Sequence, residues 1–377
     1  MGKLLIVSVL IAALAVLIGE RFSTLRNRTL AFRELTQNHL PNCELIKGIE
    51  IGAEDITILE HGLAFISSVC SPILLTLYRF DNTTTKKITV GLKYPGMPRY
   101  SDEPGKIYTL HLTSGDDPTE LQIKGDFDTA SFAPHGISVY INEEDGSVYL
   151  FVVNHPHENS QVEIFQYVEE ENALLHQKTI KHELLHNVND IVAVGVENFY
   201  ATNDHYFTND HLKLLEMLLS LHWCDVVYYS PEAVRVVAGG LLNANGINIS
   251  PDKKYLYVSD LMSHRVIVLN IQKDNSLSRV KEVAVGSLCD NIEVESKTGD
   301  LWLGCHPNGI KFILSNPNDP PGSEVIRVQN ILSDKPVVTQ VYSDNGSVLI
   351  GSSVATPYKG KLLIGTIYQK ALVCDLK

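Results

Sequence analysis

Polar residues recur along this chain in pairs, each followed by an isoleucine and then by alternating apolar positions. The repeats begin at residues 54, 135, 189, 245 and 290, and Asn189-Asp190-Ile191 is typical of them. The polar side chains concerned are Glu54, Asp55, His135, Asn189, Asp190, Asn245, Asp290 and Asn291. Seven of these eight side chains offer an oxygen atom and none offers sulfur. Taken singly, each pair is typical of a turn; taken together, they favour calcium, which prefers oxygen ligands, over zinc, which prefers histidine and cysteine.

The elements that must position these pairs are short strands. A second apolar strand is expected after each pair, at residues 63–66, 149–153, 199–202, 255–258 and 301–304, with 361–365 as a sixth. Successive repeats begin 81, 54, 56 and 45 residues apart, and propeller blades are about 40 to 50 residues long. The pattern predicts an all-β, six-bladed β-propeller whose chain ends join to close the ring. Since the first strand of each blade lines the central channel, the polar pairs converge at one mouth of a calcium-binding channel.

Two histidines are expected near this mouth of the channel, where they could take part in proton transfer. His135 opens the second repeat, and an imidazole with an ordinary pKa of about 6.5 accepts a proton near neutral pH. His155 ends the following strand and is placed to orient His135 or relay its proton; a structural hydrogen-bonding role is the alternative. His205 and His306 occupy similar strand ends. The chain has no Gly-x-Ser-x-Gly sequence, so a serine hydrolase is not supported, and Cys305 is expected to be a small apolar residue packed in a strand.

The N-terminus is typical of a secretory signal. Lys3 is followed by a run of 15 residues, 4–18, that is apolar except for Ser8. This run is shorter than the roughly 20 residues needed to cross a bilayer, so a cleaved signal or a retained hydrophobic anchor helix is favoured over a membrane-spanning helix. Every alternative predicts the secretory pathway, with an extracellular or membrane-associated protein. The run implies a lipid partner, a membrane or a lipoprotein particle, whereas a net charge of −13 argues against nucleic acid.

Longer stretches around these residues carry a family resemblance. Three of these stretches are distinctive: Pro134-His135-Gly136-Ile137-Ser138, Ala244-Asn245-Gly246-Ile247-Asn248 and Gly304-Cys305-His306-Pro307-Asn308-Gly309. With them the chain resembles the serum paraoxonase family of calcium-dependent lactonases and arylesterases, types 2 and 3 being nearer than type 1. The resemblance implies a propeller with two Ca²⁺ ions in its channel and a His135–His155 dyad. It implies a catalytic calcium on Glu54, Asn189, Asn245, Asp290 and Asn291, and a structural calcium on Asp55, Asp190 and the carbonyl of Ile137.

The cysteines and the glycosylation sequences are consistent with the secretory pathway. The resemblance implies a disulfide between Cys43 and Cys374 near the two ends of the propeller, and six buried thiols are the alternative. No CxxC pair exists, so a zinc or redox motif has no support. The Asn-x-Ser/Thr sequence, a weak signal for glycosylation, occurs at Asn82, Asn248 and Asn345 as well as in the N-terminal segment.

One segment departs from the family pattern. Residues 1–30 are interpreted as the signal or anchor and 40–377 as the propeller, but residues 69–90 form an atypical insert. Without the insert, the first spacing between repeats becomes similar to the others. The insert precedes Lys93-Tyr94-Pro95-Gly96, which the resemblance assigns to a loop that covers the active site.

The resemblance implies a calcium-dependent hydrolase of lipophilic lactones and aryl esters, in which water attacks a calcium-bound carbonyl and a histidine is the base. A sugar lactonase of the gluconolactonase kind is one alternative. The other is a non-catalytic, calcium-stabilised propeller that binds lipid or protein, if the insert at 69–90 disables the lid.

Overall fold

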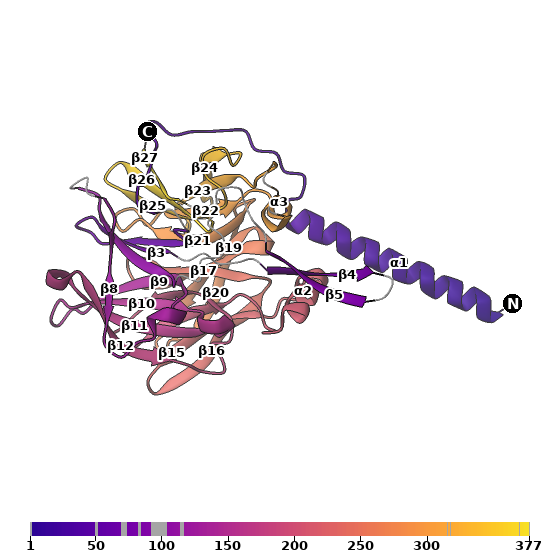
Figure 1. The fold of residues 1–377 in the computed structure, drawn as a ribbon, viewed down its shortest axis with the longest axis horizontal. Helices are drawn as coiled ribbons and strands as arrows, with labels where there is room; N and C mark the ends of the chain where they lie inside the picture. Colours follow the sequence, from indigo (N-terminus) through magenta and orange to yellow (C-terminus); the bar gives the residue numbers. More distant parts are fainter. Residues whose placement is uncertain are drawn as a thin grey trace.

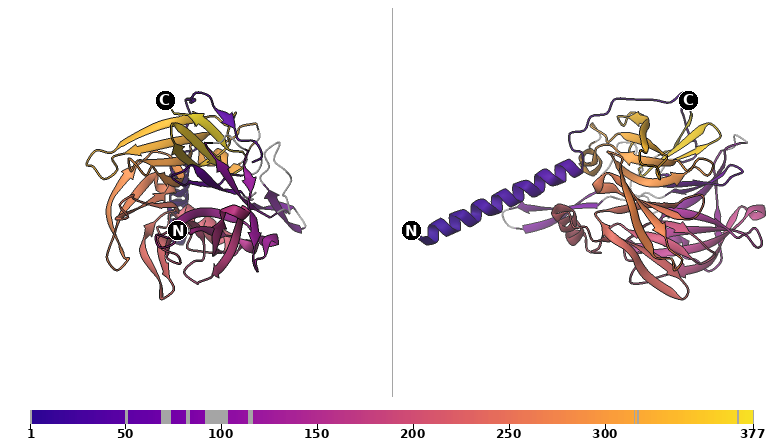
Figure 2. Two further views of the ribbon diagram at one scale, coloured as in Figure 1. Left: turned by 90° about the vertical axis from the view of Figure 1, so that its left-hand side faces the viewer. Right: turned by 180° about the vertical axis from the view of Figure 1, so that it is seen from behind.

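Sheets arranged around a central axis account for most of the chain. The computed structural model describes residues 2–49, 52–68, 74–81, 84–91, 104–113, 117–314, 316, 318–368 and 370–376. Six sheets of four or five strands form blades, and a long helix projects from one face of the ring (Figures 1 and 2). The prediction of a six-bladed β-propeller with an N-terminal apolar helix is thereby confirmed.

The first three blades follow one another along the chain, each running from the channel outwards. Blade 1 contains β2 (Asp55–Ile58), β3 (Leu63–Ser68), β6 (Lys106–His111) and β7 (Thr119–Glu120). Blade 2 contains β9 (Pro134–Ile141), β10 (Val148–Asn154), β11 (Gln161–Val168) and β12 (Ala173–Ile180), and β8 (Gln122–Lys124) pairs parallel to β12 at its outer edge. Blade 3 contains β13 (Val188–Ala193), β14 (Phe199–Asn203), β15 (Cys224–Ser230) and β16 (Ala233–Leu241).

The last three blades complete and close the ring. Blade 4 contains β17 (Ala244–Ile249), β18 (Tyr255–Asp260), β19 (Arg265–Ile271) and β20 (Leu277–Ala284). Blade 5 contains β21 (Leu288–Val294), β22 (Leu301–His306), β23 (Ser323–Gln329) and β24 (Val337–Asp344). Blade 6 combines β25 (Ser352–Tyr358), β26 (Lys361–Thr366) and β27 (Leu372–Asp375) with the N-terminal β1 (Glu44–Leu45). A disulfide joins Cys43 to Cys374 beside the β1–β27 pair, so both ends of the propeller belong to one blade.

The blades are held together by apolar side chains between them. The second strands are buried on both faces, as in β3 and β22, where every residue is buried, which explains why their sequences are apolar without alternation. One hydrophobic cluster, for example, joins Val266 and Val268 of blade 4 to Leu301 and Leu303 of blade 5. The inner strands contact one another in the cyclic order β2, β9, β13, β17, β21, β25. This ring of inner strands sets the positions of the polar pairs.

The N-terminal helix α1 (Gly2–Arg28) continues beyond the expected apolar run, from Ile18 to Arg28. Its stretch Leu5–Arg28 is long and apolar enough to cross a membrane, a test that a signal sequence also passes. The end of the helix is attached to the propeller, because the carbonyl oxygen of Arg28 lies 2.6 Å from His264 Nε2. The amide of Gly309 donates to the carbonyl of Thr29 (2.7 Å). Helices α2 (Asp210–Leu219) and α3 (Gly309–Leu314) lie on the same face (Figure 1).

The atypical insert contains a separate hairpin. Strands β4 (Leu74–Asp81) and β5 (Thr84–Gly91) pair with each other in a two-stranded sheet of their own. They lie between β3 and β6 in the sequence, which accounts for the long first spacing between repeats. Cys70 and residues 92–103, including the segment expected to cover the active site, lie outside the described residues.

Candidate active site

The predicted polar pairs of blades 2 to 5 all lie in β-bulges at the start of an inner strand. In each blade the register against the second strand shifts by one residue across the pair. In blade 5, for example, Cys289 lies opposite Cys305 and Ile292 opposite Leu303, so that Asp290 and Asn291 together face one residue. A bulge re-aims side chains that a regular strand would point alternately to its two faces. The strict alternation of the strand therefore begins only after each pair.

Two of the pairs contain glycine because neighbouring blades approach closely there. A Cβ atom on Gly136 would collide with Asp190 of blade 3. A Cβ atom on Gly246 would lie 2.6 Å from the carbonyl oxygen of Asp290 in blade 5. Only glycine permits this approach, so these two repeats contribute one polar side chain each, His135 and Asn245.

Four of the predicted calcium ligands carry a buried oxygen that lacks a hydrogen-bond partner among the described residues. These atoms are Glu54 Oε2, Asn189 Oδ1, Asn245 Oδ1 and Asn291 Oδ1. Leaving such an atom unsatisfied costs about 1–3 kcal/mol. One carboxylate and three amide oxygens form a donor set that suits Ca²⁺. No three His, Cys, Asp or Glu side chains in the described part of the chain gather closely enough to hold a metal alone, so the amides would have to take part.

The remaining atoms of these residues fix the orientation of the four oxygens. Asn291 Nδ2 donates to Glu54 Oε1 (3.0 Å) and to the carbonyl of Glu54 (3.1 Å). That carbonyl also accepts from Ser353 Oγ (2.6 Å) of blade 6. Glu54, which directly precedes β2, is thus held between blades 5 and 6, while its Oε2 has no hydrogen-bond partner among the residues that the structure describes.

Asp55 and Asp190 form a second layer that joins neighbouring blades. Asp55 Oδ2 accepts from the amide of Ile137 (2.8 Å) in blade 2. Asp190 Oδ2 accepts from the amide of Ile247 (2.7 Å) in blade 4. Both aspartates and Ile137 line a separate cavity of about 260 Å³ in the channel. Three of the ligands that the resemblance implies for the catalytic calcium, Asn189, Asn245 and Asp290, line a different cavity.

Burial makes the charged form of these carboxylates unfavourable in the absence of a cation. Burial, together with the nearby charge of Glu54, raises the pKa of Asp55 to about 8. Burial also raises the pKa of Glu54 well above its usual range, with Asp290 adding to the effect. The pKa of Asp190 is raised in the same way, by burial and then by Asp55. A bound divalent cation would offset this repulsion.

His135 lies beside Glu54 and Asn189, two of the ligands implied for the catalytic calcium, and His155 lies beside His135. His135 Nε2 is 3.3 Å from Asn189 Nδ2 and 3.6 Å from Glu54 Oε1. The two imidazole rings meet edge to face, with centroids 5.5 Å apart. His155 Nδ1 lies 3.3 Å from the carbonyl oxygen of Asn159. Burial lowers the pKa of His135, and burial together with the neighbouring His135 lowers the pKa of His155 to about 4.

The resemblance implies a place in the wall of the site for His205 and His306, but their partners Asp204 and Phe312 were not predicted from the sequence. His306 Nε2 lies 3.0 Å from Asp290 Oδ2, and its ring stacks on Phe312 of α3 at 4.2 Å between centroids. Asp204 Oδ1 lies 3.0 Å from His205 Nδ1. Aligned repeats indicate the strand ends where His205 and His306 stand, but nothing in the sequence pairs them with Asp204 and Phe312.

A cavity of about 360 Å³ opens at this mouth of the channel. Its polar wall includes His135, Asn189, Asn245 and Asp290. Its apolar lining includes Met217, Leu261, Met262, Leu288, Phe312 and Ile367. An apolar cavity with a few convergent polar groups is the usual form of a binding site for a small lipophilic molecule.

The predicted glycosylation sites and Cys305 are the remaining residues singled out in the sequence. Asn345 is exposed, whereas Asn248 lines the channel and donates from Nδ2 to the carbonyl of Ile292 (2.8 Å). Asn82 lies outside the described residues. Cys305 is buried in a strand, as expected, but it forms a disulfide with Cys289 that the sequence analysis did not predict.

Comparison with known proteins places these features in context. A family model described as Arylesterase matches residues 34–85 and 82–376, the two segments meeting within the atypical insert. Serum paraoxonase/arylesterase 2 of Rattus norvegicus is 54% identical over 378 residues, which covers 100% of both chains. Serum paraoxonase/lactonase 3 of Oryctolagus cuniculus is 50% identical with the same coverage. Regucalcin of Agrobacterium tumefaciens, described as a calcium-binding protein, superposes with a TM-score of 0.52 over 91% of this chain and 96% of its own, at 10% identity, and shows the fold alone.

Proposed function

Because the chain belongs to the arylesterase family, which includes the serum paraoxonases, we propose that it is a calcium-dependent hydrolase of lactones and aryl esters. Membership makes the protein a carboxylic ester hydrolase; its dependence on calcium and the roles of its residues are the proposal. The observation that carries the proposal is the set of four buried oxygens of Glu54, Asn189, Asn245 and Asn291, for which the described part of the chain offers no hydrogen-bond partner.

Two calcium ions fit the two layers of oxygen ligands. The catalytic ion would be held by Glu54, Asn189, Asn245, Asp290 and Asn291, of which Asn189, Asn245 and Asp290 line the cavity at the mouth of the channel. The structural ion would be held by Asp55, Asp190 and the carbonyl of Ile137, which line the other cavity. When bound, the catalytic calcium would polarise the substrate carbonyl and stabilise the negative charge that develops on its oxygen.

His135 is proposed as the general base. Its position beside Asn189 and Glu54 puts the imidazole next to the ligands that would hold the metal. There it would take a proton from the attacking water and later return it to the leaving oxygen. His155 would hold the ring of His135 in place, since it packs edge to face against it and is itself fixed near the carbonyl of Asn159.

The apolar wall of the cavity supports a lipophilic substrate. Met217, Leu261 and Phe312 line the same cavity as the polar groups, and they would bury an alkyl or aryl group while the carbonyl faces the metal ligands. A sugar lactone would instead require polar groups that recognise its hydroxyls. The apolar α1 supports a secreted or membrane-associated protein, with a membrane or lipoprotein as its lipid partner.

The test is hydrolysis of a long-chain γ- or δ-lactone by the purified full-length chain, with calcium and then with excess chelator. Turnover that requires calcium is expected. His135→Gln is expected to reduce kcat by about 10²–10⁴-fold, the usual contribution of general base catalysis, while the calcium-dependent rise in Tm persists. Turnover that survives chelation would refute the dependence on calcium. An unchanged kcat in His135→Gln would refute the role of His135 as the general base.

A further inference from the structure

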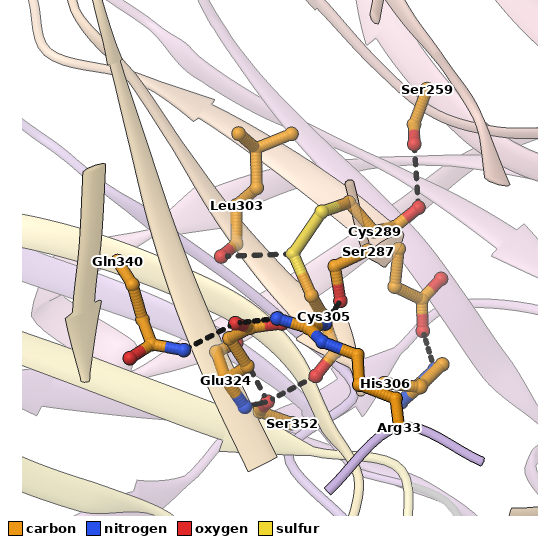
Figure 3. Close-up of a disulfide and its surroundings, with 11 residues drawn as sticks. Arg33, Ser259, Ser287, Cys289, Leu303, Cys305, His306, Glu324, Gln340 and Ser352 are labelled. Atoms are coloured by element: carbon orange, nitrogen blue, oxygen red, sulfur yellow. Dashed lines mark hydrogen bonds and ion pairs between the residues drawn. A yellow bond between two sulfur atoms is a disulfide. The ribbon is translucent and has the colours of Figure 1, made fainter. Parts of the chain in front are cut away.

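A disulfide joins the two innermost strands of blade 5 beside the calcium ligands. Cys289 of β21 and Cys305 of β22 lie directly opposite each other and are bonded through their sulfur atoms (Figure 3). Cys289 immediately precedes Asp290 and Asn291, the pair in the β-bulge. Cys305 immediately precedes His306, whose Nε2 lies 3.0 Å from Asp290 Oδ2. The bond therefore links the two segments that supply and orient the predicted ligands of this blade.

Other blades use a hydrogen bond where blade 5 has this disulfide. In blades 2, 3 and 4, the second-strand residue that pairs just before the bulge, as Cys305 does in blade 5, is polar. Its side-chain oxygen accepts a hydrogen bond from a backbone amide of the loop that leads into the inner strand. These bonds run from Ala133 to Asn154 (2.9 Å), from Asn187 to Asn203 (3.1 Å) and from Leu242 to Asp260 (3.0 Å). The residues equivalent to Cys289 are Pro134, Val188 and Ala244. A connection at this point, next to the bulge, is thus common to these four blades.

The connection matters because a bulge interrupts the hydrogen-bonded ladder. Asp290 and Asn291 face a single residue, Gly304, so the regular pairing of β21 with β22 resumes only at Ile292. On the other side of the bulge the ladder contains only the pairs Cys289–Cys305 and Leu288–His306, and the disulfide holds this short end covalently. Two buried hydroxyls hold the neighbouring carbonyls: Ser259 Oγ donates to Cys289 (2.5 Å) and Ser352 Oγ to Cys305 (2.9 Å), as Figure 3 shows.

We propose that the Cys289–Cys305 disulfide is a positioning element of the catalytic calcium site, which keeps Asp290 and Asn291 in the conformation that binds the ion. The inference rests on the proposed function of that site. Both cysteines are almost completely buried, at 1% and 0% exposure, so small thiols reach the bond only when the blade opens. A permanent constraint on ligand geometry fits this burial better than a reversible switch. Groups that orient metal ligands typically contribute about 10–100-fold to metal affinity.

The test compares calcium affinity with and without the disulfide. In Cys289→Val/Cys305→Ala, valine stands at residue 289 as Val188 does in blade 3. Isothermal titration of chelator-stripped full-length protein with calcium is expected to give a Kd for the catalytic site at least about tenfold higher than that of the unaltered chain. The rise in Tm between excess chelator and a limiting calcium concentration should shrink accordingly. If this variant does not fold, Cys289→Ser/Cys305→Ser, which nearly retains the original volume, is titrated instead.

Leu301→Ala is the matched control. Leu301 lies in β22 opposite Val294, at the other end of the same strand pair, and belongs to the same hydrophobic cluster as both cysteines. This substitution lowers Tm by loss of packing but is expected to leave the calcium Kd unchanged. A disulfide variant that binds calcium as tightly as the unaltered protein would overturn the inference. The inference would also be overturned if Leu301→Ala weakened calcium binding as much as the disulfide variant does. An unaltered protein that binds no calcium would instead overturn the proposed function.

Discussion

The disulfide that closes the ring provides a stability prediction whose size follows from the structure. Cys43 and Cys374 are 331 residues apart in the sequence, and the strand that they secure, β1, has only two residues. In the chain-entropy treatment, a cross-link stabilises the native state by restricting the unfolded chain, and more so for longer loops. The Cys43→Ser/Cys374→Ser variant removes this restriction and leaves the short β1–β27 pair to hold the blade closed.

The expected loss is about 6 kcal/mol for a loop of 331 residues at room temperature. The Cys289–Cys305 bond closes a loop of 16 residues and gives about 3 kcal/mol by the same relation. Removing the ring closure is therefore expected to destabilise the protein by about 3 kcal/mol more than removing the disulfide in blade 5. Since domains are stable by only about 5–15 kcal/mol, the ring-closure variant should be close to unfolding.

Guanidinium denaturation of the oxidised unaltered protein and of the two double variants, in the same buffer with excess chelator so that a change in calcium affinity contributes to neither loss, measures both losses. The reasoning predicts a clearly lower midpoint for the ring-closure variant than for the blade 5 variant. An equal or smaller loss on removing Cys43–Cys374 would refute it, because the propeller would then be closed by β1 and by packing between blades rather than by the covalent link.

Three further outcomes are expected. Glu54→Gln should raise the calcium Kd in titrations by at least about tenfold through loss of a ligand charge, yet leave Tm in chelator no lower, since burial already disfavours the charged carboxylate. Burial alone would raise the pKa of Asp204, but its partner His205 lowers it to about 2, and Asp204 in turn raises the pKa of His205 against the effect of burial. The stabilisation by Asp204 is thus lost as pH falls below 3.8 and that by His205 as pH rises above 6.5, so Asp204→Asn should lower Tm more at about pH 5.5 than at about pH 8.5 in thermal melts. Mass spectrometry of secreted protein should show a glycan lost in Asn345→Gln and none lost in Asn248→Gln, because Asn248 Nδ2 is engaged within the channel.

The repeats predicted the blades because their signal is local. Apolar segments such as 149–153 and 301–304 lie within β10 and β22, where burial on both faces imposes an apolar sequence on every residue. The polar pairs were predictable for the same reason, since they interrupt this pattern at matching positions. The structure brings Glu54 and Asn291 into direct contact although they are 237 residues apart.

Features that depend on strand register could not be predicted in this way. The Cys289–Cys305 bond requires knowing that β21 and β22 align these two residues across a bulge, and a shift of one residue would separate them. The contact of His306 with Phe312 likewise depends on where α3 lies after blade 5. The hairpin β4–β5 follows no repeat, so the departure from the family pattern and the unusual first spacing between repeats indicated an insertion but not its structure.

The central claim is that buried oxygens at the channel mouth and beneath it bind calcium. Elemental analysis of the purified full-length protein, dialysed against trace calcium, tests it most directly. The account predicts two calcium ions per chain, both removed by excess chelator and restored by adding calcium alone. A protein that retains no calcium under these conditions, or that retains zinc in its place, would contradict the account.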